Sequence, residues 1–199
     1  MTYVLGLTGS IGMGKSTTAR MFSDAGIPVW DADAAVHALY APDGAATRQV
    51  LALFPDVRAD DGSVSRSALR AKIAADPVIL DQLTAIVHPM VAAHRDLFLN
   101  EHANLPIVLL DIPLLFENGL ESLCNGIVVV TAPASEQRRR LQARAAMTDA
   151  EIDMITARQM PDTEKRRRAT WVIETISLDQ AHADVKDIIT QIRGQLADA

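Results

Sequence analysis

Short apolar runs alternate along most of the chain with segments of helical apolar spacing. The runs 3–7, 28–30, 107–110, 127–130 and 171–173 are typical of strands, and 107–110 and 127–130 are almost wholly apolar. Strands that are apolar throughout are buried on both faces, as in a parallel sheet covered by helices. The pattern therefore predicts an α/β fold with five short parallel strands.

Helix signals fall between these runs. The spacing is helical from Ser16 to Ala25, and Gly26 stands where that helix would stop. Two capping-box patterns, Thr148-x-x-Glu151 and Ser177-x-x-Gln180, each predict the start of a later helix.

The stretch from about residue 34 to 105 contains no strand run and has the pattern of helices joined by polar loops. Asp60-Asp61-Gly62 predicts a turn, and Ser65 is a candidate cap for the helix that holds Leu69 and Ile73. We expect this stretch to form an inserted helical subdomain.

Composition narrows the class of protein. The 199 residues are 49% hydrophobic and 22% charged, which is typical of one globular unit. The net charge of −6 argues against a protein that coats nucleic acid. One cysteine, Cys124, allows neither an intrachain disulfide nor a cysteine zinc cage. No signal peptide and no apolar run of membrane-spanning length stands out, so we expect a soluble cytoplasmic protein.

The strongest motif is Gly9-Ser10-Ile11-Gly12-Met13-Gly14-Lys15-Ser16, which fits G-x-x-x-x-G-K-[ST] in full. Its glycines let backbone N–H groups turn around phosphate oxygens. Lys15 can reach the β- and γ-phosphates, and Ser16 can ligate Mg²⁺. A glycine-rich turn that fits by chance is the alternative, but the motif lies between a predicted strand and a predicted helix, as a phosphate loop must.

A phosphate loop predicts nucleotide binding without deciding the reaction, because GTPases, motor or transport ATPases and small-molecule kinases all carry one. The chain has no N-K-x-D segment that would recognise guanine, and it is short for a motor. A helical insertion and a basic segment favour a kinase, in which a lid closes to exclude water.

Two carboxylates, Asp31 and Asp33, follow the second predicted strand, at the edge where α/β sheets bind ligands. A carboxylate there can take the proton of an acceptor hydroxyl during phosphoryl transfer. The alternative is a cap for the helix that begins near Ala34. We expect Asp33 to be catalytic and Asp31 to be the cap.

Asp111 directly follows the run 107–110, like the acidic residue that ends a Walker B strand and supports Mg²⁺. A loop aspartate satisfied by backbone N–H groups explains the same position equally well. Both interpretations stay open at this point.

Basic residues gather in the segment 136–168, where nine Lys and Arg stand against six acids. This segment therefore carries +3, and the rest of the chain −9. A cationic arm on an acidic protein favours an anionic ligand. Arg140 and Arg144 lie four residues apart, so they share a helix face and can both point at a nucleotide.

Other residues have an ordinary structural explanation. Arg138, Arg139 and much of the run 165–168 are expected to be solvated helix surface. His88 before Pro89 is more typical of a turn or a helix entry than of a catalyst. Cys124 is expected to be a small packing residue.

Taken together, the motifs resemble those of dephospho-CoA kinases, which catalyse the last step of coenzyme A biosynthesis. The resemblance extends from Gly6 to about Ile173. It comprises Gly6 to Thr17, Asp31-Ala32-Asp33, Asp61-Gly62-x-x-x-Arg66-x-x-Leu69, Leu83-x-x-Ile86-x-His88-Pro89, Asp111 to Glu117, Gln137-x-x-Arg140-Leu141-x-x-Arg144 and Gln159. Because other P-loop kinases do not usually carry the segment 111–117, the ordered combination is specific.

The resemblance implies a P-loop kinase core with a five-stranded parallel sheet, formed by residues 1–33, 106–133 and 169–199. It implies an acceptor-binding helical insertion at 34–105 and a lid at 134–168. The implied reaction transfers the ATP γ-phosphate to the ribose 3′-hydroxyl of dephospho-CoA. A kinase for another nucleoside, nucleotide or small metabolite is the first alternative, and a nucleotide-binding regulatory ATPase is the second.

The resemblance also implies residue roles. Asp33 matches the family's proposed base, and Lys15 and Arg140 match its phosphate-stabilising cations. The expected nucleotide contacts are Gly9, Gly12, Met13, Gly14, Lys15, Ser16, Thr17 and Arg144. The expected acceptor contacts are Asp33, Arg66, His88, Pro113, Leu114 and Glu117, and the expected Mg²⁺ ligands are Ser16 and Asp111. We expect a monomer or weak oligomer that binds ATP, Mg²⁺ and dephospho-CoA, and neither nucleic acid nor a membrane.

Overall fold

The structure is a computed structural model that describes residues 2–145 and 147–198, without the side chains of residues 144 and 145. It divides into two compact units. The sheet unit consists of the chain up to residue 30 and from residue 102 onward, and the helical unit consists of residues 31–101. The predicted insertion had the boundaries 34 and 105, so the helical unit both begins and ends slightly earlier.

Five strands form one sheet in the order β2-β3-β1-β4-β5. They are β1 (Tyr3–Thr8), β2 (Val29–Asp31), β3 (Ile107–Asp111), β4 (Gly126–Thr131) and β5 (Trp171–Glu174). Strand β1 pairs in parallel with both β3 and β4, and β4 pairs in parallel with β5. The predicted α/β fold with a five-stranded parallel sheet is confirmed.

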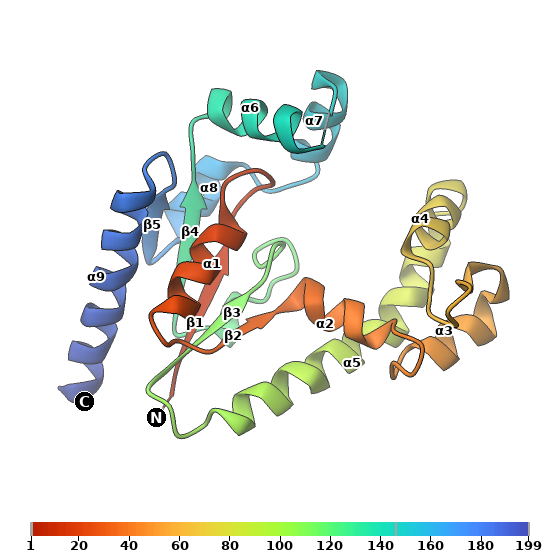
Figure 1. Ribbon diagram of the computed structural model, residues 1–199, viewed down its shortest axis with the longest axis horizontal. Coiled ribbons are helices and arrows are strands. Elements are labelled where there is room, and N and C mark those ends of the chain that lie inside the picture. Colours follow the sequence, from red (N-terminus) through yellow and green to blue (C-terminus); the bar gives the residue numbers. More distant parts are fainter. Residues whose placement is uncertain (1, 146, 199) are drawn as a thin grey trace. The chain divides into compact units, whose positions relative to one another are not determined.

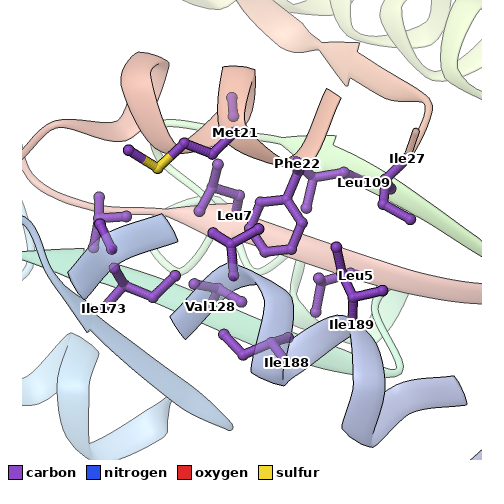
Figure 2. Close-up of a cluster of buried hydrophobic side chains, with 14 of the residues drawn as sticks. Leu5, Leu7, Met21, Phe22, Ile27, Leu109, Val128, Ile173, Ile188 and Ile189 are labelled. Atoms are coloured by element: carbon purple, nitrogen blue, oxygen red, sulfur yellow. The ribbon is translucent and has the colours of Figure 1, made fainter. Parts of the chain in front are cut away.

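One face of the sheet is covered by α1 (Lys15–Asp24) and α9 (Leu178–Ala197). Leu5 and Leu7 lie two residues apart on β1, so both side chains point to this face. Phe22 of α1 is fully buried there, between the strands and α9 (Figure 2). This cluster holds α1 against the sheet, and α1 begins directly after the phosphate motif.

The opposite face of β1 is covered by the chain that follows β3. Gly6 points to this face, where a Cβ would lie 2.7 Å from Cys124 Sγ and 2.9 Å from a methyl of Leu115. Glycine at this position therefore makes room for both side chains, as expected for a packing role of Cys124. The short helix η2 (Glu121–Leu123) also lies against β1, and α8 (Asp162–Arg168) lies against β4.

The helical unit contains α2 (Ala32–Leu39), α3 (Thr47–Leu53), η1 (Pro55–Val57), α4 (Arg66–Ala75) and α5 (Val78–Glu101). It has a core of its own, in which Val50, Phe54 and Leu83 are buried together. Helices α2 and α5 pack along each other (Figure 1). The Ser65 side chain accepts a hydrogen bond from Ala68 N–H and caps α4, as predicted.

His88 and Pro89 lie inside α5, so the expectation of a turn or a helix entry is wrong. Leu83 and Val87 are buried in the core of the helical unit, and both His88 and Pro89 are exposed. Packing of the buried face thus keeps the helix intact through a proline, which has no N–H to donate to the preceding turn.

The remaining helices are α6 (Ala134–Ala145) and α7 (Asp149–Thr156). Thr148 and Glu151 form the predicted capping box at the start of α7. At α9 the Ser177 side chain caps the Gln180 N–H, but the Gln180 side chain bonds to Asp184 instead of completing the box. Among the helices that the structure describes, none is long and apolar enough to cross a membrane.

Candidate active site

The phosphate-binding motif lies in the turn between β1 and α1 (Figure 1). Gly12 and Gly14 have φ angles of +79° and +90°, in the left-handed region that residues with a Cβ rarely adopt. Gly14 is the N-cap residue of α1, and no side chain caps this helix start. The first N–H groups of a helix form a site for anions. The turn therefore has the backbone geometry of a phosphate-binding loop.

The other loop residues differ in burial, and this decides which of them can meet a ligand. A Cβ on Gly9 would lie 2.7 Å from a backbone oxygen of β4, so only glycine fits there. Met13 is buried, and its sulfur accepts a hydrogen bond of 3.1 Å from Ala132 N–H. Ser16 and Thr17 are exposed on the first turn of α1, so their hydroxyl groups are open to a ligand.

Lys15 and Asp111 form an ion pair between the loop and the end of β3. Lys15 Nζ lies 2.6 Å from Asp111 Oδ1, and the two side chains are 15% and 3% exposed. Because β1 and β3 are neighbours in a parallel sheet, the loop after one and the carboxylate at the end of the other share an edge. The structure thus places Asp111 beside the phosphate loop.

The donors assigned to Mg²⁺ are the Ser16 hydroxyl and the Asp111 carboxylate. Within the part of the chain that the structure describes, no group of three or more His, Cys, Asp or Glu could hold a metal ion. Mg²⁺ usually keeps several waters and binds one or two carboxylates together with substrate phosphates. This donor set therefore suits a Mg²⁺ ion that arrives with a nucleotide.

The predicted pair of carboxylates lies at the start of α2. Asp31 Oδ1 accepts a hydrogen bond of 3.0 Å from Ala34 N–H, which confirms Asp31 as the helix cap. Asp33 lies in the first turn of the same helix. Since Asp31 meets the capping requirement, the Asp33 carboxylate is available for another task.

A cavity of about 480 Å³ opens in the helical unit beside α2. Asp33 lines it together with Arg66, the first residue of α4, which was predicted to contact the acceptor. His37 lines it as well, one helical turn after Asp33, and the sequence analysis did not assign it. The spacing of four residues on α2 was the available signal. His88 is not among the residues that line this cavity.

The segment after β3 carries three further predicted acceptor contacts. The carbonyl of Pro113 accepts a hydrogen bond of 3.0 Å from Thr8 Oγ1, which ties the segment to the end of β1. Leu114 is 39% exposed and free to meet a ligand. Glu117 differs, because its carboxylate is engaged within the chain.

Glu117 Oε1 lies 2.8 Å from Lys165 Nζ and accepts a hydrogen bond of 2.9 Å from Met160 N–H. Lys165 is fully buried, so the expectation of a solvated surface is wrong for this member of the run 165–168. A charge buried this deeply needs a partner of opposite sign, and Glu117 supplies it. The contact joins the segment after β3 to α8.

Two effects act on the pKa of Glu117. Burial raises it, but the Lys165 ammonium 2.8 Å away and the hydrogen bond from Met160 N–H lower it by more. The net pKa is below the ordinary glutamate value, so Glu117 is ionised near neutral pH.

Arg140 lies on α6 and meets the residue that follows β5. Its Nη1 donates to Thr175 Oγ1 (2.9 Å), its Nη2 donates to Thr175 O (2.6 Å) and its Nε donates to Glu136 Oε1 (2.7 Å). Nη1 is also 3.5 Å from Gly12 O, so the guanidinium is beside the phosphate loop. Hydrogen bonds from Arg139 and Arg140 lower the pKa of Glu136 to about 2. The sequence analysis assigned no role to Thr175.

The neighbouring arginines behave as expected or fall outside the described side chains. Arg138 pairs with Asp149 and Asp153 of α7, and Arg139 pairs with Glu136. Both arginines form surface ion pairs, which contribute little to the stability of the fold. Arg144, a predicted nucleotide contact, has a side chain that lies outside the described part of the structure.

Comparison with known proteins identifies the family. A family model described as dephospho-CoA kinase matches residues 3–180. The chain belongs to the dephospho-CoA kinase family. All of the residues predicted for its active site lie inside the matched range, whereas most of α9 lies beyond it.

Individual relatives agree with this assignment. A dephospho-CoA kinase from Cereibacter sphaeroides is 56% identical over 98% of both chains. One from Jannaschia sp. is 52% identical over 96% of this chain and 98% of the other. The crystal structure of a Thermus thermophilus protein superposes with a TM-score of 0.82 at 36% identity, over 96% of this chain and 97% of that one.

Proposed function

We propose that the chain transfers the γ-phosphoryl group of ATP to the ribose 3′-hydroxyl of dephospho-CoA, giving coenzyme A and ADP. The observation that carries the proposal is the family match over residues 3–180, which contains both the phosphate loop and the cavity residues Asp33 and Arg66. The names of the relatives at 56% and 52% identity support the same substrate.

Asp33 is the proposed general base. Its carboxylate accepts the proton of the 3′-hydroxyl while that oxygen forms a bond to the γ-phosphorus. The bond from this phosphorus to the β–γ bridging oxygen breaks, and ADP leaves with the electron pair. Arg66, His88, Pro113 and Leu114 are the proposed acceptor contacts. For Glu117, whose carboxylate is engaged with Lys165 and Met160, we propose a positioning role instead.

The phosphate loop is the proposed ATP site. Backbone N–H groups at the start of α1 and the Lys15 ammonium would bind the phosphates, and Lys15 would exchange part of its contact with Asp111 for phosphate oxygens. Ser16 and Asp111 are the proposed holders of Mg²⁺, which neutralises charge on the phosphate oxygens when it is bound.

Residues 134–168 are the proposed lid, with Arg140 and Arg144 as cations that face the phosphates. Phosphoryl transfer depends mostly on positioning and charge stabilisation, so these arginines would contribute to rate without forming a covalent bond. The place of Arg140 beside Gly12 O supports its role.

The test is Mg²⁺-dependent release of ADP from ATP, measured with and without dephospho-CoA, with the product identified by mass spectrometry. We expect strong stimulation by dephospho-CoA and one added phosphate on the ribose. A matched acceptor that already carries a 3′-phosphate, coenzyme A itself, is expected to give no stimulation.

Other outcomes would point to the alternatives. A folded, ATP-binding sample stimulated by a different nucleoside or metabolite, and not by dephospho-CoA, would make the chain a kinase for that acceptor. ATP hydrolysis that no acceptor changes would instead favour a nucleotide-binding regulatory protein.

A further inference from the structure

Three side chains hold the outer edge of the phosphate loop. Gln137 Nε2 donates a hydrogen bond of 2.7 Å to Ile11 O, and Gln159 Oε1 accepts one of 3.1 Å from Ile11 N–H. Thr175 Oγ1 donates one of 2.8 Å to Met13 O. We call Gln137, Gln159 and Thr175 the loop clamp.

The clamp residues come from separate parts of the sheet unit. Gln137 lies on α6, Gln159 lies between α7 and α8, and Thr175 follows β5. Gln137 is 9% exposed and Thr175 is 8% exposed. Polar groups buried to this degree are costly unless they are paired, so these hydrogen bonds are maintained in the folded chain.

Thr175 is the most connected member of the clamp. Its hydroxyl accepts from Arg140 and has one proton to donate, for which Met13 O at 2.8 Å is closer than Thr131 O at 3.3 Å. Its N–H bonds to Thr131 O at the end of β4. Its side chain also lies against Gly14, where a Cβ would meet it at 3.0 Å. Thr175 is therefore held in place by the sheet and touches two residues of the loop.

The clamp determines the direction of the peptide groups that face a phosphate. In a trans peptide the C=O and the N–H of the next residue point in opposite directions. The structure contains no cis peptide among its described residues. Because Thr175 holds the Met13 carbonyl on the outer side, the Gly14 N–H must point the other way. Gln137 imposes the same constraint on Gly12 through Ile11 O.

We propose that Gln137, Gln159 and Thr175 are positioning residues that preorganise the phosphate loop for ATP. Gln137 and Thr175 bind the carbonyls of Ile11 and Met13, so that the N–H groups of Gly12 and Gly14 face inward before the nucleotide arrives. Gln159 fixes the position of Ile11 through its N–H. This inference deepens the proposed function and assumes only that ATP binds at the loop. Donors that already face inward need no rearrangement when ATP binds. Loss of the clamp is therefore expected to weaken ATP binding more than it lowers kcat.

The test compares Thr175→Val with Thr175→Ser. Valine keeps the shape of threonine but removes the hydroxyl, and serine keeps the hydroxyl. For Thr175→Val we expect the dissociation constant for ATP, measured by calorimetry, and the KM for ATP to rise about tenfold. We expect kcat and the KM for dephospho-CoA to change far less, and Thr175→Ser to bind ATP nearly as the parent chain does.

Two further variants make the test decisive. Thr190→Val on α9 removes an exposed hydroxyl that bonds to Lys186 O within its own helix, and we expect unchanged ATP binding. Gln137→Met removes the hydrogen bond to Ile11 O at similar side-chain size, and it replaces Thr175→Val if valine prevents folding. We expect it to weaken ATP binding several-fold.

Unchanged ATP affinity in the folded Thr175→Val or Gln137→Met variant would overturn the clamp. A fall in kcat with unchanged ATP affinity would overturn it as well. The ATP affinity on which both results depend is measured by direct binding, which does not involve the acceptor. A different acceptor would therefore refute the proposed function and leave the clamp standing.

Discussion

Asp31 and Asp33 are two residues apart on the same turn of chain, yet their carboxylates are placed for different tasks. Both residues line the cavity with Arg66 and His37, but only the Asp31 carboxylate accepts the capping hydrogen bond from Ala34 N–H. Asparagine caps a helix about as well as aspartate, but its amide cannot accept the proton of a hydroxyl. The same Asp→Asn change therefore separates the two roles.

We predict that Asp33→Asn folds and binds ATP but loses at least about a hundredfold in kcat. Asp31→Asn is the matched control, and we expect a much smaller loss because the cap is retained. Steady-state rates with saturating ATP and dephospho-CoA measure both. Equal losses in the two variants would remove Asp33 from the mechanism as the base.

At the residue scale, sequence patterns predicted what depends on near neighbours. The Asp31 cap and the Ser65 cap depend on backbone groups three residues away, and both are confirmed. Lys165 was mispredicted because a run of four basic residues is typical of solvated surface. Its burial depends on Glu117, which is far away in the sequence. The role of Thr175 was missed for the same reason, since its partners Met13 and Arg140 are distant.

Among the helices, α8 depends on the buried pair between Lys165 and Glu117. Removal of one partner of a buried ion pair leaves a charge without compensation, which typically costs about 3–5 kcal/mol. We predict that Lys165→Met lowers the free energy of unfolding by an amount in this range, measured by urea denaturation. Adding Glu117→Gln to Lys165→Met is expected to recover much of the loss, because the amide oxygen can still accept from Met160 N–H. A double variant as unstable as Lys165→Met would contradict the ion-pair explanation.

The same pair gives the stability of the chain a component that depends on pH. The pKa of Glu117 is lower in the folded chain than the ordinary glutamate value, because the hydrogen bond from Met160 N–H and the nearby Lys165 ammonium outweigh burial. A carboxyl with a depressed folded pKa stabilises the fold above its unfolded pKa, and this contribution is lost as the pH falls through the folded pKa. We predict that stability falls less steeply between pH 5 and pH 3 in the Glu117→Gln, Lys165→Met double variant than in the parent chain. Urea titrations at a series of pH values provide the measurement, and parallel curves would refute the prediction.

In helix α5, packing outweighs a local conformational preference. A histidine followed by proline predicts a boundary, because proline disfavours helical geometry in the residue before it. Leu83 and Val87 lie on the preceding turns and are nevertheless buried in the core of the helical unit, which keeps these turns helical. Strands were easier to predict, since β3 and β4 are apolar except for Asp111 and Thr131 at their ends, and their burial on both faces follows from this composition.

At the scale of the whole molecule, the phosphate loop belongs to the sheet unit and the Asp33 cavity belongs to the helical unit. We predict that ATP with Mg²⁺ slows hydrogen exchange at residues 9–18 and leaves α4 and α5 unchanged. Addition of dephospho-CoA is expected to slow exchange in α2, which carries Asp33. Protection of α2 by ATP alone would show that the nucleotide also acts on the helical unit.

The order of the strands has a consequence for how the chain is made. Strand β1 lies at the centre of the sheet, between β3 and β4, yet it is the first strand to be synthesised. At roughly 5–20 residues per second, an interval on the order of ten seconds separates completion of β1 from completion of β3, the first of its two neighbours to be made. During that interval an apolar segment on the ribosome has neither of its final neighbours. Newly made chains therefore pass through a period in which chaperones that shield β1 from other nascent chains would improve the yield of folded protein.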